Sequence, residues 1–278
     1  MNTGAKVALY ATALAAIFGG TWAAGAAAGP PAPPPAHAEQ AHTDTHEQPQ
    51  SKLPPGLSVA DNGYTLRLNE TDPGTFHIEG PDGQPVTKFA LEHEKRLHLI
   101  AVRRDGSNFQ HVHPQMAENG TWTTPLTFPE AGTYRLFADF KPEAGAKTTL
   151  GADVHIPGNY QPRHQTDSRT FQADGYEVTL NGDLNAGKAS TVQLDITKDG
   201  KPITNLQDYL GAKGHLVALR ADDLAYLHVH PEKSDQVKFA VEVPTAGKYG
   251  LFLDFKHDNT VRTAEFTLTT HEEGGHGH

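Results

Sequence analysis

The chain contains no cysteine and only two methionines in 278 residues. Without thiols no disulfide can form, so each folded domain must be held together by its hydrophobic core. Thiolate metal sites, including blue-copper centres and iron–sulfur clusters, are excluded for the same reason. The thioethers of Met1 and Met116 are too few for a soft Cu(I) cage.

An excess of positive charge is also lacking, since 23 Lys and Arg oppose 33 Asp and Glu and give a formal net charge of −10. Proteins that bind nucleic acid neutralise its phosphates with a basic face. We therefore expect no nucleic-acid partner. The acidic balance suits a soluble surface that attracts cations.

Residues 7–28 form an uncharged run rich in Ala and Gly, preceded by Lys6 and followed by a Pro-rich stretch. Such a run, with Ala36-His37-Ala38 as a cleavage site, is typical of a secretory signal peptide. Its length of about 22 residues is also typical of a retained membrane anchor. Both interpretations of residues 1–28 predict an exported protein of the cell envelope, and the anchor adds a membrane contact.

Residues 29–56 are rich in Pro, Ala, His, Gln and Thr without an apolar period, which predicts a flexible stalk. The chain ends in a His-rich tail at residues 271–278. These two segments are either solvated linkers or a weak gathering surface for Cu(II), Zn(II) or Ni(II), because imidazoles and carboxylates suit such ions.

Between these segments the chain repeats itself at an offset of 117 positions. Residues 98–114 read HLIAVRRDGSNFQHVHP, and residues 215–231 read HLVALRADDLAYLHVHP. A second pair, PEAGTYRLFADFK and PTAGKYGLFLDFK, follows in the same order. A period this long predicts a duplicated domain rather than a solenoid. We place the two domains at residues 57–157 and 170–270, joined by a linker at 158–169.

Short segments that alternate apolar and polar residues fill both copies, separated by Pro, Gly and Asp. In the first copy we expect strands at 64–68, 97–103, 109–113, 122–128, 133–140 and 148–156. In the second copy we expect them at 176–180, 192–197, 215–220, 226–230, 237–243, 248–255 and 262–269. This spacing predicts an all-β fold of two tandem immunoglobulin-like or cupredoxin-like sandwiches after an N-terminal hydrophobic helix. Tyr134 and Tyr249, each beside a turn, are expected to be structural.

Three histidines recur in each copy: His98, His111 and His113 in the first, and His215, His228 and His230 in the second. An Asp-Gly pair at 105–106 predicts a tight hairpin turn, which places His98 opposite His113 and Ile100 opposite His111. Alternation along the strands puts these side chains on one face. The imidazoles of each trio are therefore expected to converge.

Three neutral imidazoles with one open position are a known arrangement for zinc(II) or copper(II). We expect one such site in each copy, open toward solvent. Asp139 and Asp254 are candidate fourth ligands, or partners that orient a histidine from outside the ligand shell. The alternative is that the histidines are half-buried packing residues bonded to backbone carbonyls.

Five further histidines lack a counterpart in the other copy and are expected at the surface: His77, His93, His155, His164 and His257. Among them His93 stands between Glu92 and Glu94, just before the first trio. These two carboxylates are candidates for additional acidic ligands at the first site.

The chain carries the motifs HEKRLHLI and HVHP within residues 92–114, and YLGAKGHLVAL and YLHVHP within residues 209–231. On these motifs it resembles a group of exported, membrane-anchored bacterial proteins best known from actinobacteria, over roughly residues 57–270. The resemblance implies two tandem sandwiches but no established activity. More remotely, each sandwich is similar to periplasmic copper-resistance carriers of the CopC type. Those carriers use a mature N-terminal histidine, whereas cleavage after Ala38 would leave Glu39 first here.

The leading hypothesis is a non-enzymatic protein of the cell envelope that binds copper(II) or zinc(II) for buffering or delivery. A second hypothesis is a structural sandwich module that binds another envelope protein and uses its histidines for packing. A third is a metal-dependent hydrolase with a three-histidine site. Against the third, no general base recurs beside the histidines of both copies.

Overall fold

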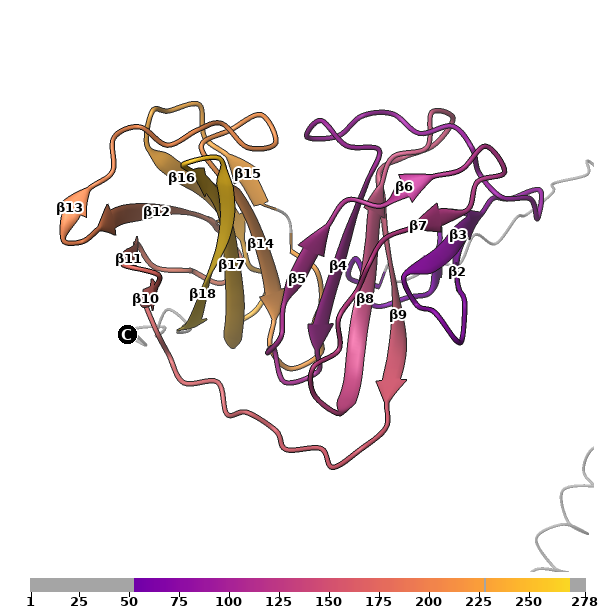
Figure 1. Ribbon diagram of the computed structural model, residues 1–278, viewed down its shortest axis with the longest axis horizontal. Coiled ribbons are helices and arrows are strands. Elements are labelled where there is room, and N and C mark those ends of the chain that lie inside the picture. The colour runs from indigo at the N-terminus through magenta and orange to yellow at the C-terminus, as the bar shows by residue number, and fades with distance from the viewer. Residues whose placement is uncertain (1–52, 228, 271–278) are drawn as a thin grey trace, which may run out of the picture. The chain divides into compact units, whose positions relative to one another are not determined.

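The structure is a computed structural model that describes residues 53–227 and 229–270. All regular elements in these residues are β-strands (Figure 1). The described part contains no helix with the length and apolar character needed to cross a membrane. The expected N-terminal helix and the His-rich tail lie outside the described residues.

The first sandwich has two antiparallel sheets. One sheet has the order β1-β2-β3-β7-β6, with β1 at Ala60–Asp61, β2 at Tyr64–Leu68, β3 at Thr75–Glu79, β7 at Trp122–Thr123 and β6 at Gln115–Met116. The other has the order β5-β4-β8-β9, with β5 at Gln110–Val112, β4 at Leu97–Arg103, β8 at Gly132–Phe140 and β9 at Thr148–Ile156.

The second sandwich repeats this plan. One sheet has the order β10-β11-β12-β16-β15, with β13 paired to β12. Its strands are β10 at Thr170–Ala173, β11 at Tyr176–Asn181, β12 at Ala189–Lys198, β13 at Lys201–Pro202, β15 at Val229–Pro231 and β16 at Val237–Glu242. The other sheet has the order β14-β17-β18, with β14 at His215–Arg220, β17 at Lys248–His257 and β18 at Thr260–Thr269.

The order of these strands is that of an immunoglobulin-like sandwich. In the second copy the sheet β11-β12-β16-β15 holds the first, second, fifth and fourth main strands, and β14-β17-β18 holds the third, sixth and seventh. This division is the one that constant-type immunoglobulin domains show. The predicted all-β fold with two tandem sandwiches is therefore confirmed.

Each copy also contains a tyrosine corner, the hydrogen bond that closes the turn before the sixth strand in many such domains. The hydroxyl of Tyr134 donates to the carbonyl of Glu130 at 3.0 Å, and that of Tyr249 donates to the carbonyl of Thr245 at 2.6 Å. Both rings are fully buried. The expectation that these tyrosines are structural is confirmed.

Most expected strands lie close to their predicted positions, and two differ. β7 ends at Thr123 rather than at residue 128, since Pro125 and Pro129 interrupt the segment and cannot donate to a ladder. The strand expected at 226–230 begins only at Val229. It pairs with β16 of the other sheet rather than with β14.

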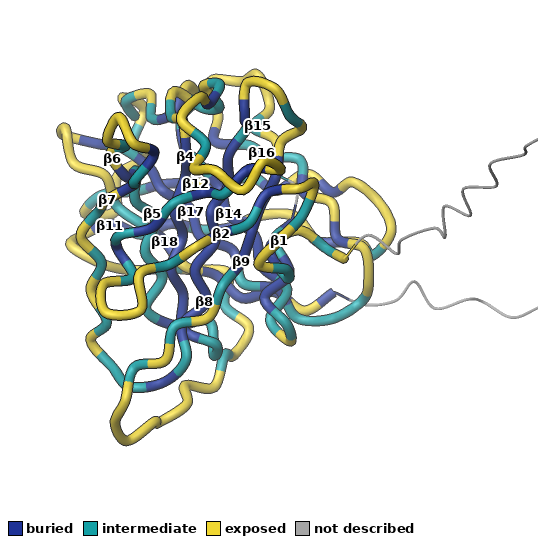
Figure 2. Tube along the Cα trace, turned by 90° about the vertical axis from the view of Figure 1, so that its right-hand side faces the viewer, coloured by how far each residue is buried: buried dark blue, intermediate teal, exposed yellow. Residues whose placement is uncertain are grey.

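Each sandwich has its own apolar core, and a separate apolar cluster joins the two copies. The joining cluster combines Ile100, Val102 and Phe137 of the first copy with Val217, Leu219, Leu224 and Phe252 of the second. The ring of Phe109 stacks on that of Phe252 across the same contact. The sheets containing β4 and β14 are thus covered on both faces, and buried residues run through these two strands (Figure 2).

Candidate metal centre

The first trio lies on the hairpin of β4 and β5. Ile100 pairs with His111 in the register that the sequence predicted. The turn is longer than the expected two residues, because Arg103 bonds to Ser107 and Asn108 follows with a left-handed φ of 54°. The extra residues are accommodated without a shift of the pairing, so the histidines remain on one face.

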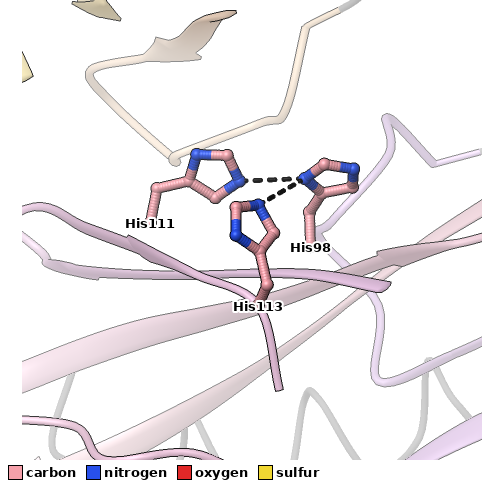
Figure 3. Close-up of side chains that lie close together, drawn as sticks. All are labelled: His98, His111 and His113. Atoms are coloured by element: carbon pink, nitrogen blue, oxygen red, sulfur yellow. Dashed lines mark hydrogen bonds between the residues drawn. The ribbon is translucent and has the colours of Figure 1, made fainter. Parts of the chain in front are cut away.

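The ring nitrogens of the trio converge (Figure 3). The Nδ1 atom of His98 lies 3.0 Å from Nε2 of His111 and 3.2 Å from Nε2 of His113. One ligand atom from each ring falls within 4.8 Å of the other two, and no other described group of three His, Asp or Glu residues meets this criterion. The predicted convergence of the first trio is therefore present in the structure.

Two outer contacts determine which nitrogens carry protons. The Nε2–H of His98 donates to the carbonyl of Glu92 at 3.0 Å, because a carbonyl oxygen can only accept. The Nδ1–H of His111 donates to the carboxylate of Asp254 at 2.6 Å. When both rings are neutral, the remaining nitrogens of His98 and His111 are bare, and their lone pairs face each other across 3.0 Å.

An extra proton on His98 would remove the repulsion between the two lone pairs, but the surroundings of this ring disfavour its protonation. Burial, and next the nearby His111, lower the pKa of His98 to about 4. Burial, with His111 and His98 close by, lowers the pKa of His113 to about 3. His98 and His113 are therefore neutral at physiological pH, a state in which imidazole nitrogens are free to bind a metal ion.

The expectation that the site opens toward solvent is wrong. His98 is only 2% exposed, and the side chain of His111 has no exposed surface. The second sandwich covers the trio, because the ring of His215 stacks on that of His98 at a centroid distance of 5.3 Å. It also stacks on His111 at 4.9 Å. Burial lowers the pKa of His215 well below its ordinary value.

The histidines of the second copy differ from the expected separate site. His215 contributes to the first cluster, whereas His230 lies on β15 and is exposed. His228 lies outside the described residues. A second ion held by His215, His228 and His230 thus stays a prediction, and the position of His215 links it to the first trio.

The two aspartates lie opposite the expected histidines, since Asp139 pairs with His98 and Asp254 with His215 in the strand register, but their side-chain contacts differ from those expected. Asp254, a candidate ligand for the second trio, bonds instead to His111 of the first copy, and Thr263 donates to its other oxygen at 2.6 Å. Asp139, expected at the first trio, accepts from Thr149 at 2.7 Å and pairs with Lys147 at 3.2 Å. Asp254 therefore acts as the orienting partner, and it does so from the opposite sandwich.

The sequence analysis did not predict that His93 lies beside the histidine cluster, and its prediction that His257 lies at the surface is wrong. His93 is half-buried, with its ring 5.4 Å from that of His215 and 6.1 Å from that of His98. It reaches this position from a turn in which its own φ is 46°. His257 is 7% exposed rather than at the surface and bonds to the hydroxyl of Tyr176. For His93 the only signal was its place beside the first trio.

The chain belongs to the protein family described as a domain of unknown function (DUF8832), whose model matches residues 54–158 and again residues 171–272. The predicted duplication is confirmed by these two matches. None of the curated proteins matches the chain.

Several solved structures are similar at low identity. One, "Anomalous substructure of Titin-A168169", is 11% identical with a TM-score of 0.20, over 79% of this chain and 96% of that chain. Another, "I-band fragment I67-I69 from titin", is 12% identical with a TM-score of 0.20, over 72% of this chain and 60% of that chain. At these TM-scores the similarity supports no inference about function.

Proposed function

We propose that this protein binds a divalent metal ion, copper(II) or zinc(II), at a centre formed by His98, His111 and His113. The observation that carries the proposal is the 3.0 Å contact between two bare ring nitrogens, each of whose partner nitrogens is fixed by an outer hydrogen bond. Two facing lone pairs repel, and a cation between them removes that repulsion. A buried metal ion supplies this cation at a pH where His98 does not retain an extra proton.

The distances suit such an ion. A tetrahedral zinc with Zn–N bonds of about 2.0–2.1 Å separates its ligand nitrogens by about 3.3 Å, and the structure has 3.0 Å and 3.2 Å. Neutral imidazole is a ligand for both zinc and copper. The fourth position is open for water or for His215, whose ring lies against the trio.

The contact from Asp254 to His111 supports the same proposal. Histidine ligands commonly donate their second N–H to a carboxylate, which fixes the ring and raises its basicity as a ligand. Here the carboxylate comes from the other sandwich. The centre therefore includes residues of both domains.

We assign this centre to storage or delivery of the ion rather than to hydrolysis. His98 is only 2% exposed and the side chain of His111 has no exposed surface. These two rings therefore leave no open approach for a substrate. The proposal includes a location at the cell envelope, which the uncharged run at residues 7–28 supports because it is typical of a signal peptide or membrane anchor.

Metal analysis by inductively coupled plasma mass spectrometry tests the proposal. The full chain, produced without an affinity tag and dialysed against a weak chelator, is expected to retain metal. His111→Ala combined with His113→Ala should remove one equivalent. The matched control, His271→Ala with His276→Ala in the tail, should leave that equivalent in place. Equal retention by both double variants would show that the trio is not the site.

A structural role for the histidines is the second candidate, because the cluster lies in the contact between two apolar sheets. On this account the purified protein holds no metal. The substitutions at His111 and His113 then lower the melting temperature without changing metal content.

A further inference from the structure

A cavity of about 520 Å³ lies between the second sandwich and the linker that precedes it. Its volume is in the range of small-molecule sites, about 300–1,000 Å³. Apolar side chains of β14 and β17, including Leu219 and Phe252, form part of its wall, and linker residues 163–166 form another part. The metal trio is not among its lining residues.

The same region of the first sandwich is filled by an arginine. Arg135 pairs with Val102 on β4, just as Gly250 pairs with Leu219 on β14, so Gly250 stands where the first copy has Arg135. The Arg135 guanidinium donates to the carbonyl of Gly56 at 2.6 Å. It also lies 6.0 Å from the centroid of the Phe137 ring.

The neighbouring strand shows the reverse exchange. Gly151 faces Phe137 on β9, and Glu265 faces Phe252 on β18, so Glu265 stands where the first copy has Gly151. A side chain at Gly151 has no room, because its Cβ would lie 1.9 Å from the carbonyl oxygen of Gly56 and 2.8 Å from Nε of Arg135. The first copy thus has an arginine here, which pairs with Asp153 at 3.0 Å, whereas the second copy has Gly250 and Glu265 at the two exchanged positions.

Glu265 forms no ion pair within 4 Å and no side-chain hydrogen bond with another described residue, although Arg163 of the same wall lies near enough to lower its pKa. Lys248 pairs with Asp167 at 3.4 Å, and Arg163 pairs with Glu130. Asp105, the other carboxylate of the wall, pairs with Arg103 at 2.7 Å. Glu265 is exposed on β18, but partial burial against the cavity raises its pKa more than the nearby Arg163 lowers it, and a bound cation would favour its charged form.

We propose that this cavity binds a small organic cation, a guanidinium or primary ammonium group on a short apolar body, between Glu265 and the ring of Phe252. The cation would occupy the place that the Arg135 guanidinium takes beside Phe137 in the first copy. Ion pairing with the carboxylate and attraction to the aromatic ring both favour a cation at this place. The site is independent of the metal centre.

Titration with propylguanidinium, which is the arginine side chain without its backbone, tests this proposal by NMR on the isotope-labelled full chain. We expect saturable shifts of amide signals around Glu265 and Gly250. Propylurea, which has the same shape without the charge, should bind at least about tenfold more weakly.

Two variants of the chain complete the test. Glu265→Gln should weaken binding of propylguanidinium about tenfold or more, whereas the exposed control Glu118→Gln should not. Gly250→Arg restores the side chain of the first copy and should abolish binding. It requires the Phe252 ring to yield slightly, because a Cβ at Gly250 would lie 3.3 Å from it.

Three results would overturn the proposal: no saturable binding, equal binding of propylurea, or unchanged binding by Glu265→Gln. The metal content of the protein reports on the metal centre, and Glu265→Gln should leave that content unchanged. Failure of this proposal is therefore distinguishable from failure of the proposed metal centre. If Gly250→Arg does not fold, the comparison of Glu265→Gln with Glu118→Gln still tests whether Glu265 holds the cation.

Discussion

At the scale of single residues, the outer hydrogen bonds of the histidines carry most of the chemistry. His98 donates one N–H to the carbonyl of Glu92, and His111 donates one N–H to the carboxylate of Asp254. In the neutral rings the remaining nitrogens therefore carry no proton. Without these outer contacts, either ring could change tautomer and the two nitrogens could share an ordinary hydrogen bond.

The Asp254 contact leads to a prediction about affinity. Asp254→Asn should weaken metal binding about 10–100-fold, the usual effect of losing such a partner, as measured by competition with a coloured chelator. The control is the residue at the same place in the other repeat, Asp139→Asn. Its carboxylate is engaged by Thr149 and Lys147, so affinity should change little. Equal losses in both variants would contradict the assigned role of Asp254.

The low pKa of His98 predicts how stability depends on pH. Its pKa is about 4 in the folded protein against about 6.5 when unfolded, so protons favour the unfolded chain. The metal-free protein should keep its full stability above about pH 6.5 and lose on the order of 3 kcal/mol from this residue as pH falls toward 4. Thermal unfolding between pH 8 and pH 4 measures this. A melting temperature equally pH-dependent in His98→Phe would assign the effect to other groups.

At the scale of strands and turns, the sequence was sufficient for much of the fold. Alternation located β2, β4 and β9 at their observed bounds, and the pairing of Ile100 with His111 followed from the turn. The contact of the two copies was not predicted, because alternation within a strand does not identify what covers its second face. A signal existed: β4 reads LHLIAVR and is buried throughout, and a near-continuous apolar run is typical of a strand covered on both faces.

The tyrosine corners give a prediction at this scale. Tyr249→Phe removes the hydroxyl that donates to the carbonyl of Thr245 and keeps the buried ring. Such a loss should lower the free energy of unfolding by about 1 kcal/mol, measured by urea titration of the metal-free protein. Tyr226→Phe is the comparison within the same sandwich, as no hydrogen bond of its hydroxyl joins it to another described residue. Equal effects of the two substitutions would contradict the role of the corner.

At the scale of the whole described structure, the metal centre and the contact between the sandwiches depend on each other. The trio belongs to the first copy, while Asp254 and His215 belong to the second. Any state that separates the sheets removes both of these neighbours. Thermodynamic linkage then requires that a bound ion strengthens the contact by the same factor by which the contact strengthens binding of the ion.

A charge placed in the contact should therefore weaken metal binding without touching the trio. Val217 faces the first copy and is 1% exposed. Val217→Asp should separate the sandwiches, increase the radius of gyration in small-angle X-ray scattering and lower metal affinity about 10–100-fold. The control is Val261→Asp, at a position that is 41% exposed. Separation of the sandwiches with unchanged affinity would refute the linkage.

X-ray absorption spectroscopy of the full chain, loaded with one equivalent of zinc and washed with a weak chelator, tests the central claim most directly. We predict a first shell at about 2.0–2.1 Å with the outer-shell pattern of imidazole rings, lost on His111→Ala combined with His113→Ala. A first shell of oxygen atoms alone, or a spectrum that the double substitution leaves unchanged, would contradict a metal centre at His98, His111 and His113.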